Sequence, residues 1–501
     1  MGLLRIHLVA CVLLFAFSAC TATSYPNRPL ADGAANEEGR ALASPPGRPA
    51  ILMTFSGGGS RAAALDLFVL EELRRYGDGE SGRRLIDDVA FVSSVSGGSV
   101  TAAYLGLYGP DAIDQLGPDF LARDNMATLE LQAVDPVTWF RLAFGGYTRV
   151  DALRDLFDRQ IFHDRTFAAM RSQPIVILNA TDMASGEVFA FTAERFNDIC
   201  SDLSGLPVSV GVASSAAFPV LLSPVDLQNH AVGCRGKLPA DAWIRKDLNS
   251  RYTRYIDVEE YKRARYANAL RHGEGAFRDV EYLHLLDGGL ADNLGTHSLL
   301  DAIESPHGTF RLLEAINTGK LRRLVVITVN ARSDPMSRLD QEATTPGIVS
   351  MVGAVISNPL DAATASIASQ RRALLSELRT AAASAPPDAL FGGVRVFDIE
   401  IDFDQFRPEQ SDLQRKVKTI PTLWTVTPEQ LAQLDEAAKL LLRQNPCFQQ
   451  LLLDVGASAP FIDPSFAATG CPQPQPPPAR SAPQPRGRVT AMIPGISSAR
   501  E

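Results

Sequence analysis

The chain has 501 residues, of which 46% are hydrophobic and 21% are charged, as is normal for a globular protein with a large core. Its formal net charge of −9 argues against nucleic acid as a partner. The sequence contains no Walker-type phosphate loop and no cysteine–histidine pattern with the spacing of a zinc site. We therefore expect neither a metal nor another cofactor.

The first 19 residues form a candidate export signal. Arg5 precedes an apolar stretch from Leu8 to Phe17, which is too short for a comfortable membrane span. The letters FSAC, which end at Cys20, resemble the lipobox of bacterial lipoproteins, although Phe17 stands where leucine is usual. In such a box the cysteine becomes the lipidated first residue. We therefore expect an exported protein that Cys20 anchors to a membrane, facing the periplasm or the cell exterior.

Two segments flank the predicted folded domain. Residues 20–50 contain several prolines and have no sustained apolar period, which predicts a flexible linker. Residues 456–501 include PQPQPPPARSAPQPRGR, and this proline-rich composition predicts a largely disordered tail. The folded domain is therefore expected over residues 51–455.

Between these flanks, short apolar runs alternate with helical apolar patterns. Strands are predicted at residues 51–55, 88–92, 174–182, 187–193, 281–286, 321–330 and 393–403. Helices are predicted at residues 61–76, 100–108 and 425–453. In the last of these, Thr427 and Gln430 form a capping pattern, and Pro446 interrupts the helix. This alternation predicts an α/β fold with a mostly parallel sheet covered by helices on both faces.

Gly57, Gly58 and Gly59 follow the first predicted strand and precede a helix. Their backbone can approach a ligand closely and present N–H groups to a phosphate or to an oxyanion. A dinucleotide-binding loop is disfavoured, because Ala62 stands where that pattern needs its third glycine. Arg61 is a candidate for steering an anionic group, or else it pairs with a surface acid.

Ser96 lies between a predicted strand and a predicted helix, in the sequence FVSSVSGGSVTAAY. In a nucleophile elbow, a serine at such a turn exposes its hydroxyl, and the residues two before and two after it are normally glycine. Gly97 and Gly98 suit this elbow, but Ser94 occupies the position of the first glycine. Taken alone, the motif indicates a tight turn better than it indicates a nucleophile.

A partner base for Ser96 has two kinds of candidate. Histidines would complete a serine–histidine–aspartate triad, but His284 lies in an apolar strand and His297 in the first turn of a helix, where structural roles are more typical. Asp287 ends a strand and is followed by two glycines, so another loop can approach it closely. As an isolated motif, this Asp-Gly-Gly indicates a surface turn.

The exported part contains the cysteines Cys200, Cys234, Cys447 and Cys471. In an oxidising compartment, four cysteines allow three pairings, and the sequence does not choose among them. Local spacing favours Cys200 with Cys234 and Cys447 with Cys471, while buried free thiols are the alternative.

Taken together, the motifs of this chain resemble those of the patatin-like family of lipid acyl hydrolases. Three of them occur in this order: SGGGSR, SVSGG and DGGLADN. Two further stretches match the same family, namely NATDMASGE and ASSAAFPVLLSPV. The resemblance extends from Ile51 to Val329. It implies a three-layer α/β sandwich. It also implies that Ser96 is the nucleophile, that Asp287 is its partner in a dyad without histidine, and that the glycines 57–59 supply the oxyanion-hole N–H groups.

The resemblance further implies a phospholipase A or lysophospholipase type of activity that proceeds through an acyl-enzyme and needs no cofactor. The expected partners are a phospholipid or other lipid ester and a membrane surface. Two alternatives stay open. One is a non-catalytic surface lipoprotein that binds lipid or protein, and the other is a serine esterase that acts on non-lipid esters through Ser96 and a histidine.

Overall fold

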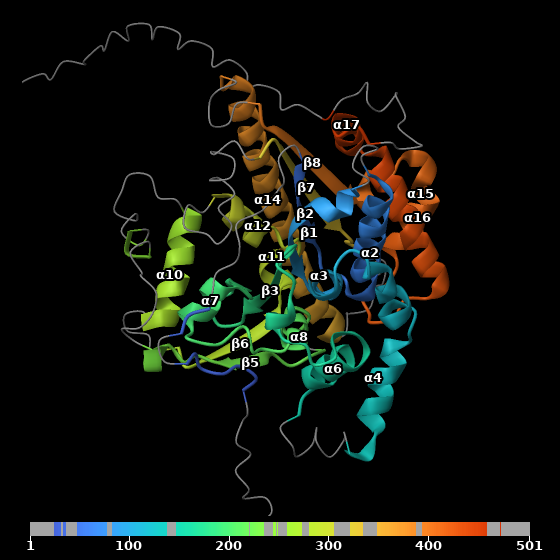
Figure 1. Cartoon of the computed structure of the whole chain (residues 1–501). Helices are drawn as coiled ribbons and strands as arrows, with labels where there is room; N and C mark the ends of the chain where they lie inside the picture. The colour runs from blue at the N-terminus through green and yellow to red at the C-terminus, as the bar shows by residue number, and fades with distance from the viewer. Residues whose placement is uncertain are drawn as a thin grey trace, which may run out of the picture.

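Figure 1 shows the computed structural model of the chain. It describes residues 25–31, 34–36, 48–77, 83–137, 147–219, 221–234, 244–246, 248, 258–272, 280–304, 321–333, 348–386, 393–457 and 471. Across these ranges, no helix is both long enough and apolar enough to cross a membrane. The predicted signal, Cys20 and nearly all of the predicted tail lie outside them.

A mixed, eight-stranded sheet forms the centre of the fold, in the order β5-β6-β3-β2-β1-β7-β8, with β4 beside β3. The strands are β1 Pro49–Phe55, β2 Val89–Val95, β3 Ile175–Asp182, β4 Val188–Ala190, β5 Val225–Gln228, β6 Tyr282–Asp287, β7 Arg323–Asn330 and β8 Arg395–Asp402. The run from β3 through β2, β1 and β7 to β8 is parallel, whereas β6 is antiparallel to both β3 and β5. The predicted, mostly parallel sheet is confirmed.

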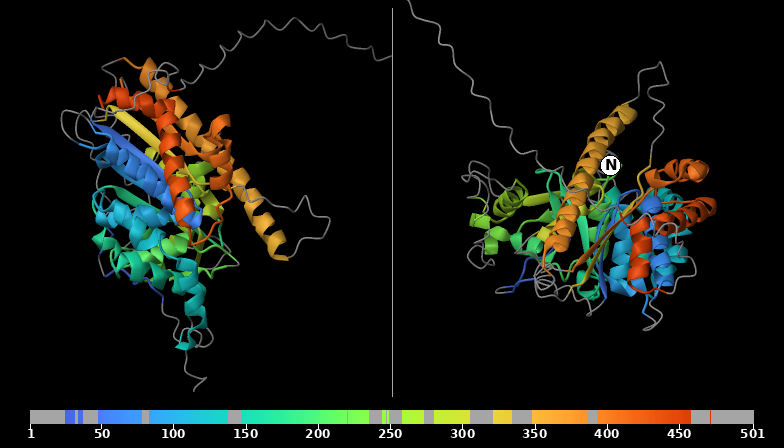
Figure 2. Two further views of the ribbon diagram at one scale, coloured as in Figure 1. Left: turned by 90° about the vertical axis from the view of Figure 1, so that its right-hand side faces the viewer. Right: turned by 90° about the horizontal axis from the view of Figure 1, so that it is seen from above.

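Helices cover both faces of this sheet. They are α2 Gly59–Arg75, α3 Gly97–Tyr108, α4 Asn125–Val134, α6 Arg149–Phe157, α7 Ala193–Asp198, α8 Val208–Ser215, α10 Val258–His272, α11 Gly289–Asp292, α12 Thr296–Glu304, α14 Ile348–Ser384, α15 Ser411–Lys418, α16 Pro428–Gln444 and α17 Pro446–Asp454. Seen from above, α14 lies on one side of the strands, and α2 and α16 lie on the other (Figure 2).

The two faces follow from the alternation of side chains along a strand. In β1, Met53 and Phe55 pack into the core under α2, α3 and α16, whereas Ala50 and Leu52 pack into the core under α12 and α14. Every residue of β1 and β2 is buried, so both faces of these two strands are covered. The predicted α/β sandwich of helix, sheet and helix layers is therefore confirmed.

Two features of the last helices follow the sequence pattern. The Gln430 N–H donates to Thr427 Oγ1 (3.2 Å), and the Thr427 N–H donates to Gln430 Oε1 (2.9 Å), which completes the predicted capping box. Pro446 opens α17 after α16 has ended at Gln444. Strand β5 and the long helix α14 are elements that the apolar pattern did not predict.

Part of the predicted linker lies against the domain. Asn27 Nδ2 donates to Ser201 Oγ (2.8 Å) and to the Gln228 carbonyl (2.7 Å), and the Leu30 N–H donates to the Cys200 carbonyl (3.0 Å). Strand β1 begins at Pro49, before the expected boundary at Ile51. The described residues of this segment are therefore held by polar contacts that its composition does not reveal.

Two disulfides join Cys200 to Cys234 and Cys447 to Cys471. They are the pairings that local spacing favours. The first holds the end of α7 to the short helical turn that follows β5, and the second joins the start of α17 to Cys471, beyond the end of that helix.

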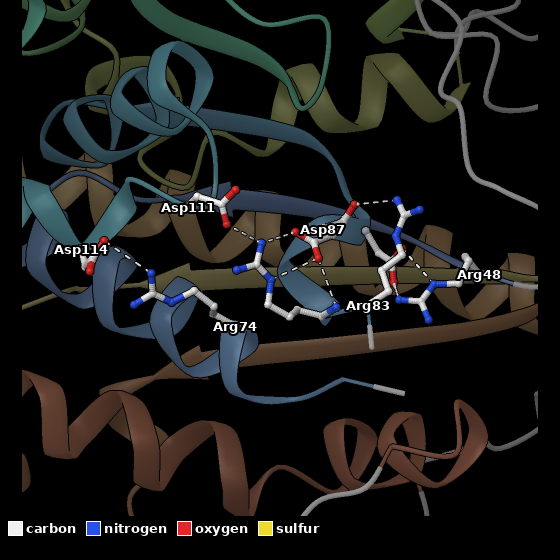
Figure 3. Close-up of polar contacts among 8 residues, drawn as sticks. Arg48, Arg74, Arg83, Asp87, Asp111 and Asp114 are labelled. Atoms are coloured by element: carbon white, nitrogen blue, oxygen red, sulfur yellow. Dashed lines mark hydrogen bonds and ion pairs between the residues drawn. The ribbon is translucent and has the colours of Figure 1, made fainter. Parts of the chain in front are cut away.

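A group of ion pairs lies at the far end of β2, away from the strand-to-helix turn that follows it (Figure 3). Arg84 donates to Asp87 (2.8 Å), just before β2, and to Asp111 (2.7 Å), just after α3. The neighbouring pairs are Arg48–Asp88, Arg83–Asp88 and Arg74–Asp114. Asp88 is buried, whereas the pairs of Arg84 and Arg74 lie at the surface, where such a pair contributes up to about 1 kcal/mol.

Candidate active site

Ser96 occupies a sharp turn between β2 and α3. Its backbone has φ 51° and ψ −123°, outside both helix and strand regions. A non-glycine residue with positive φ costs on the order of 1–3 kcal/mol and persists only where its surroundings hold it. Such a turn lifts the hydroxyl out of the line of the strand, as a nucleophile elbow does.

Close packing explains the glycines after Ser96. A Cβ atom at Gly97 would lie 2.0 Å from the Gly59 carbonyl oxygen, and one at Gly98 would lie 2.8 Å from the Ser56 carbonyl oxygen. Both contacts are far too short for a side chain. The elbow and the glycine loop therefore touch backbone to backbone, which only glycine permits.

Ser94, which replaces the first glycine of the elbow pattern, lies inside β2 between Phe55 of β1 and Leu178 of β3. Its hydroxyl lies 3.1 Å from Ser99 Oγ and 3.2 Å from the Ile177 carbonyl oxygen. A small polar side chain therefore has room and partners at this position.

Asp287 meets Ser96 at the end of β6. Ser96 Oγ donates to Asp287 Oδ2 (2.8 Å), and the Gly289 N–H donates to Asp287 Oδ1 (2.8 Å). Burial raises the pKa of Asp287 to about 6, against the opposing effect of these two hydrogen bonds. A carboxylate with this pKa is a stronger base than an ordinary aspartate and is still ionised at neutral pH.

The sheet register brings Asp287 to the elbow. Asp287 pairs with Ala180 of β3, and its N–H donates to the Ala217 carbonyl (3.0 Å). Its own carbonyl accepts from Thr181 Oγ1 (2.8 Å). A Cβ atom at Gly288 would stand 2.2 Å from the Asn179 carbonyl oxygen, so the residue after Asp287 has to be glycine.

The histidine candidates lie elsewhere. His284 is exposed on β6, where its Nδ1 lies 2.6 Å from Asp226 Oδ1. His297, in the first turn of α12, lies 3.4 Å from Asp292. Within the described ranges, the Ser96 hydroxyl is bonded to Asp287 and to no histidine. In the same ranges, no group of three or more histidine, cysteine or acidic side chains could hold a metal ion.

The glycine loop presents fewer free N–H groups than the sequence predicts. The Gly57 N–H donates to the Asn293 carbonyl (3.1 Å), so it is already used. Gly58 and Gly59 have φ of 147° and 58°, and their N–H groups donate to no acceptor in the described part of the chain. They stand at the N-terminus of α2, where the helix dipole favours negative charge. Gly58 and Gly59, rather than Gly57, are therefore the candidate oxyanion donors.

Residues 53–300 match the family model of the patatin-like phospholipases. They form a patatin-like phospholipase domain. No curated protein matches the sequence.

Two solved structures of one human enzyme share features with the chain. Human GIVD cytosolic phospholipase A2 is 12% identical over 81% of this chain and 60% of that chain, with a TM-score of 0.39. The same enzyme in complex with methyl gamma-linolenyl fluorophosphonate is 12% identical over 81% and 59%, with a TM-score of 0.35. The chain thus spans about 60% of the length of the first of these.

Arg61 of the patatin-like domain does not face a ligand. Its side chain is buried, and it donates to the carbonyls of Ala331 (2.8 Å) and Ile420 and to Thr422 Oγ1 (3.2 Å). Burial lowers the pKa of Arg61 to about 10, so the guanidinium stays charged at neutral pH. The predicted anion-steering role is therefore wrong. Instead, Arg61 links α2 to the segment after β7 and to the segment after α15.

Sequence reasoning missed two polar residues of the patatin-like domain. Asn293 accepts the Gly57 N–H, and its side-chain Oδ1 would lie 2.5 Å from a Cβ atom at Gly57. Ser215 accepts the N–H of Ser96 with both its Oγ (2.8 Å) and its carbonyl (3.2 Å). Asn293 ends the motif DGGLADN, and Ser215 lies in ASSAAFPVLLSPV. The spacing of these motifs does not indicate that either residue contacts the elbow.

Proposed function

We propose that this protein is a lipid acyl hydrolase, of the phospholipase A or lysophospholipase type, in which Ser96 and Asp287 form a catalytic dyad. The proposal is carried by the 2.8 Å hydrogen bond from Ser96 Oγ to Asp287 Oδ2, at a strand-to-helix turn inside a patatin-like phospholipase domain. The N–H groups of Gly58 and Gly59, which donate to no acceptor among the described residues, lie beside this turn and support it.

In the acylation step, Ser96 Oγ bonds to the ester carbonyl carbon while its proton passes to Asp287. The carbonyl oxygen becomes an oxyanion, which the N–H groups of Gly58 and Gly59 would stabilise; losing one such donor typically costs about 3–4 kcal/mol. The intermediate then collapses and the C–O bond to the alcohol breaks. The leaving alkoxide takes the proton back from Asp287, and the acyl group remains on Ser96.

The deacylation step uses the same groups with water. Asp287 accepts a proton from a water molecule as the water oxygen bonds to the acyl carbonyl carbon. The second oxyanion is stabilised by the same N–H groups. Its collapse releases a fatty acid and returns the proton to Ser96 Oγ, so that one ester and one water give one acid and one alcohol.

A membrane surface as partner is supported by exposed apolar side chains at Leu423, beside the glycine loop, and on and just beyond α4. The Leu423 carbonyl accepts the Ser60 N–H (2.8 Å), and the Leu423 side chain is 41% exposed. Nearby, Thr425 Oγ1 donates to Asp124 (2.9 Å), which caps α4. Leu131 on α4 and Val137 just beyond it are 69% and 67% exposed. We infer that these exposed apolar side chains contact lipid.

Export and lipidation of Cys20 are part of the same proposal. They would hold the domain at a membrane that carries its substrate. Metabolic labelling with a fatty-acid analogue tests this directly: the full chain should be labelled and Cys20→Ala should not.

A fluorophosphonate probe tests the chemistry, because it reacts with activated serines. The wild type should be labelled and should release fatty acid from phospholipid. Ser96→Ala should do neither, and Asp287→Asn should do both at least about 100-fold more slowly. Ser204→Ala, which removes an exposed serine hydroxyl, should behave as the wild type.

Three outcomes contradict the proposal. Equal labelling of the wild type and Ser96→Ala would show that Ser96 is not the nucleophile. Full hydrolysis by Asp287→Asn favours an esterase that uses a histidine. If the folded wild type neither reacts with the fluorophosphonate probe nor hydrolyses lipid, a lipid- or protein-binding lipoprotein is favoured.

A further inference from the structure

We propose that Ser215 is the positioning residue of the dyad: it holds the backbone of Ser96 and the strand end of Asp287 at a fixed separation. The inference rests on the proposed function of Ser96. Ser215 is the last residue of α8 and is fully buried. It does not touch the Ser96 hydroxyl, so it acts through the backbone of the elbow.

Ser215 holds Ser96 with two polar groups. The Ser96 N–H donates to Ser215 Oγ (2.8 Å) and to the Ser215 carbonyl (3.2 Å). Ser96 has a positive φ, which a residue other than glycine keeps only when neighbouring groups fix it. A bifurcated hydrogen bond to a single buried residue is such a constraint.

The same segment holds the other member of the dyad. The Ser215 carbonyl also accepts the Gly288 N–H (3.0 Å), and the Ala217 carbonyl accepts the Asp287 N–H (3.0 Å). The backbone that carries Ser96 and the backbone that carries Asp287 are therefore bonded to one short stretch, residues 215–217. A change at this stretch alters the distance between the nucleophile and its base.

The Ser215 hydroxyl has a defined direction. It has one proton, which it donates to the Asn179 carbonyl (2.6 Å). Its oxygen must therefore accept in the 2.8 Å contact with Ser99 Oγ, so the Ser99 hydroxyl is the donor there. The Ser94 hydroxyl also has one proton, and both Ser99 Oγ (3.1 Å) and the Ile177 carbonyl (3.2 Å) lie within reach as acceptors. A one-way chain of hydroxyls thus runs from Ser99 on α3 through Ser215 on α8 to the Asn179 carbonyl of β3.

Ser94, which stands where the elbow pattern has glycine, borders this chain through its 3.1 Å contact with Ser99 Oγ. Ser94, Ser99 and Ser215 are all fully buried, and each has a hydrogen-bond partner. Removing the Ser215 hydroxyl would leave the Ser99 O–H and the Asn179 carbonyl without that bond, and Ser96 N–H with only its longer contact. Displacing a reacting group by about 1 Å can cost about 100-fold in rate.

The neighbouring residue supplies a matched control. Ser214 is also fully buried on α8, but its hydroxyl donates to the Val210 carbonyl within the same helix (2.7 Å). Ser214→Ala and Ser215→Ala therefore remove the same group from adjacent buried positions. Only the second loses a contact with the elbow.

With a soluble ester substrate, Ser215→Ala should lower kcat about 10- to 100-fold and leave KM within about two-fold, because it moves the reacting groups and not the lipid contacts. The rate of fluorophosphonate labelling should fall with kcat. Ser215→Thr, which keeps the hydroxyl oxygen, should recover part of the loss. Ser214→Ala should keep the wild-type kcat and labelling rate after correction for the folded fraction.

Hydrogen exchange of the Ser96 amide gives a readout independent of activity. Protection of that amide should fall in Ser215→Ala and stay unchanged in Ser214→Ala. Wild-type labelling and wild-type amide protection in folded Ser215→Ala would overturn the inference, as would equal losses in the two variants. By contrast, failure of the proposed function appears as equal labelling of wild type and Ser96→Ala, or as no labelling of either, and the exchange measurement still decides the role of Ser215.

Discussion

Gly97 stands so close to Gly59 that a Cβ atom at Gly97 would lie 2.0 Å from the Gly59 carbonyl oxygen. Gly97 belongs to the elbow after Ser96, and Gly59 belongs to the glycine loop at the start of α2. Gly59 itself leaves no room, because a Cβ atom there would lie 2.5 Å from the Leu423 carbonyl oxygen. The nucleophile turn and the candidate oxyanion donors therefore form one packed unit.

Gly97→Ala should push the elbow away from the glycine loop and reduce the rate of fluorophosphonate labelling by at least about 100-fold. Forcing a methyl group into closely packed backbone typically costs about 1–3 kcal/mol of stability, which thermal unfolding would measure. Gly233→Ala is the control, because no atom lies within 4 Å of its added Cβ. Wild-type labelling of Gly97→Ala would show that the loop and elbow do not act together.

The pH profile of kcat/KM should report the carboxyl group of Asp287. Burial raises its pKa to about 6, and only the ionised form can accept the proton of Ser96. Activity on a neutral soluble ester should therefore rise with pH, reach half its maximum near pH 6 and stay level above about pH 7. His284→Asn and His297→Asn should keep this midpoint. A shift of the midpoint in either variant would point to a histidine base.

Asp287→Asn should stabilise the protein at neutral pH while it removes activity. The folded pKa of about 6 exceeds the ordinary value of 3.8, so folding favours the protonated acid. The wild type is then most stable with respect to this group below about pH 3.8 and loses that contribution as pH rises through about 6. At pH 8 the variant should be more stable by up to about 3 kcal/mol, at 1.36 kcal/mol per pKa unit.

Chemical denaturation at two pH values measures this effect. The stability difference between Asp287→Asn and wild type should be largest at pH 8 and nearly absent near pH 4. A difference of the same size at both values would mean that the variant acts through packing and not through the buried charge.

Arg61→Lys should lower the stability of the fold and leave the preference for anionic substrates unchanged. Lysine cannot reproduce the guanidinium bonds to Ala331, Ile420 and Thr422 from one position. We expect a loss of about 2–3 kcal/mol in the free energy of unfolding, because buried carbonyls lose charged donors. The ratio of kcat/KM for anionic and zwitterionic lipids should stay as in the wild type. A selective loss on anionic lipids would restore the steering role.

Replacing Leu131 and Val137 together by Glu should weaken binding to vesicles of zwitterionic phosphatidylcholine. These side chains are largely exposed, so the folded state should be unaffected. Hydrolysis of vesicle lipid should fall by at least about ten-fold, while hydrolysis of a soluble ester should be unchanged. Leu453→Glu on α17 is the control, since Leu453 is also exposed (45%). Equal loss in all variants would contradict a membrane contact at α4.

Local sequence determined much of the fold. Strand β1 and the first part of β2 follow from apolar runs, and the helix α2 follows from apolar residues three and four positions apart. Runs of glycine and serine marked the two turns around the candidate site, because such turns need residues without bulky side chains. The order of the motifs was enough to indicate the family, since it depends only on the linear sequence.

Only the tertiary structure decided which polar groups meet. Ser96 and Asp287 are 191 positions apart, and Ser96 and Ser215 are 119 apart, so their contacts depend on the register of β3 and β6 and on the packing of α8. The fold likewise commits the Gly57 N–H to the Asn293 carbonyl and bonds the Arg61 side chain to the Ala331 carbonyl, beyond the end of β7. Composition and spacing describe each turn by itself, but hydrogen bonds between distant segments exist only once the sheet has placed those segments side by side.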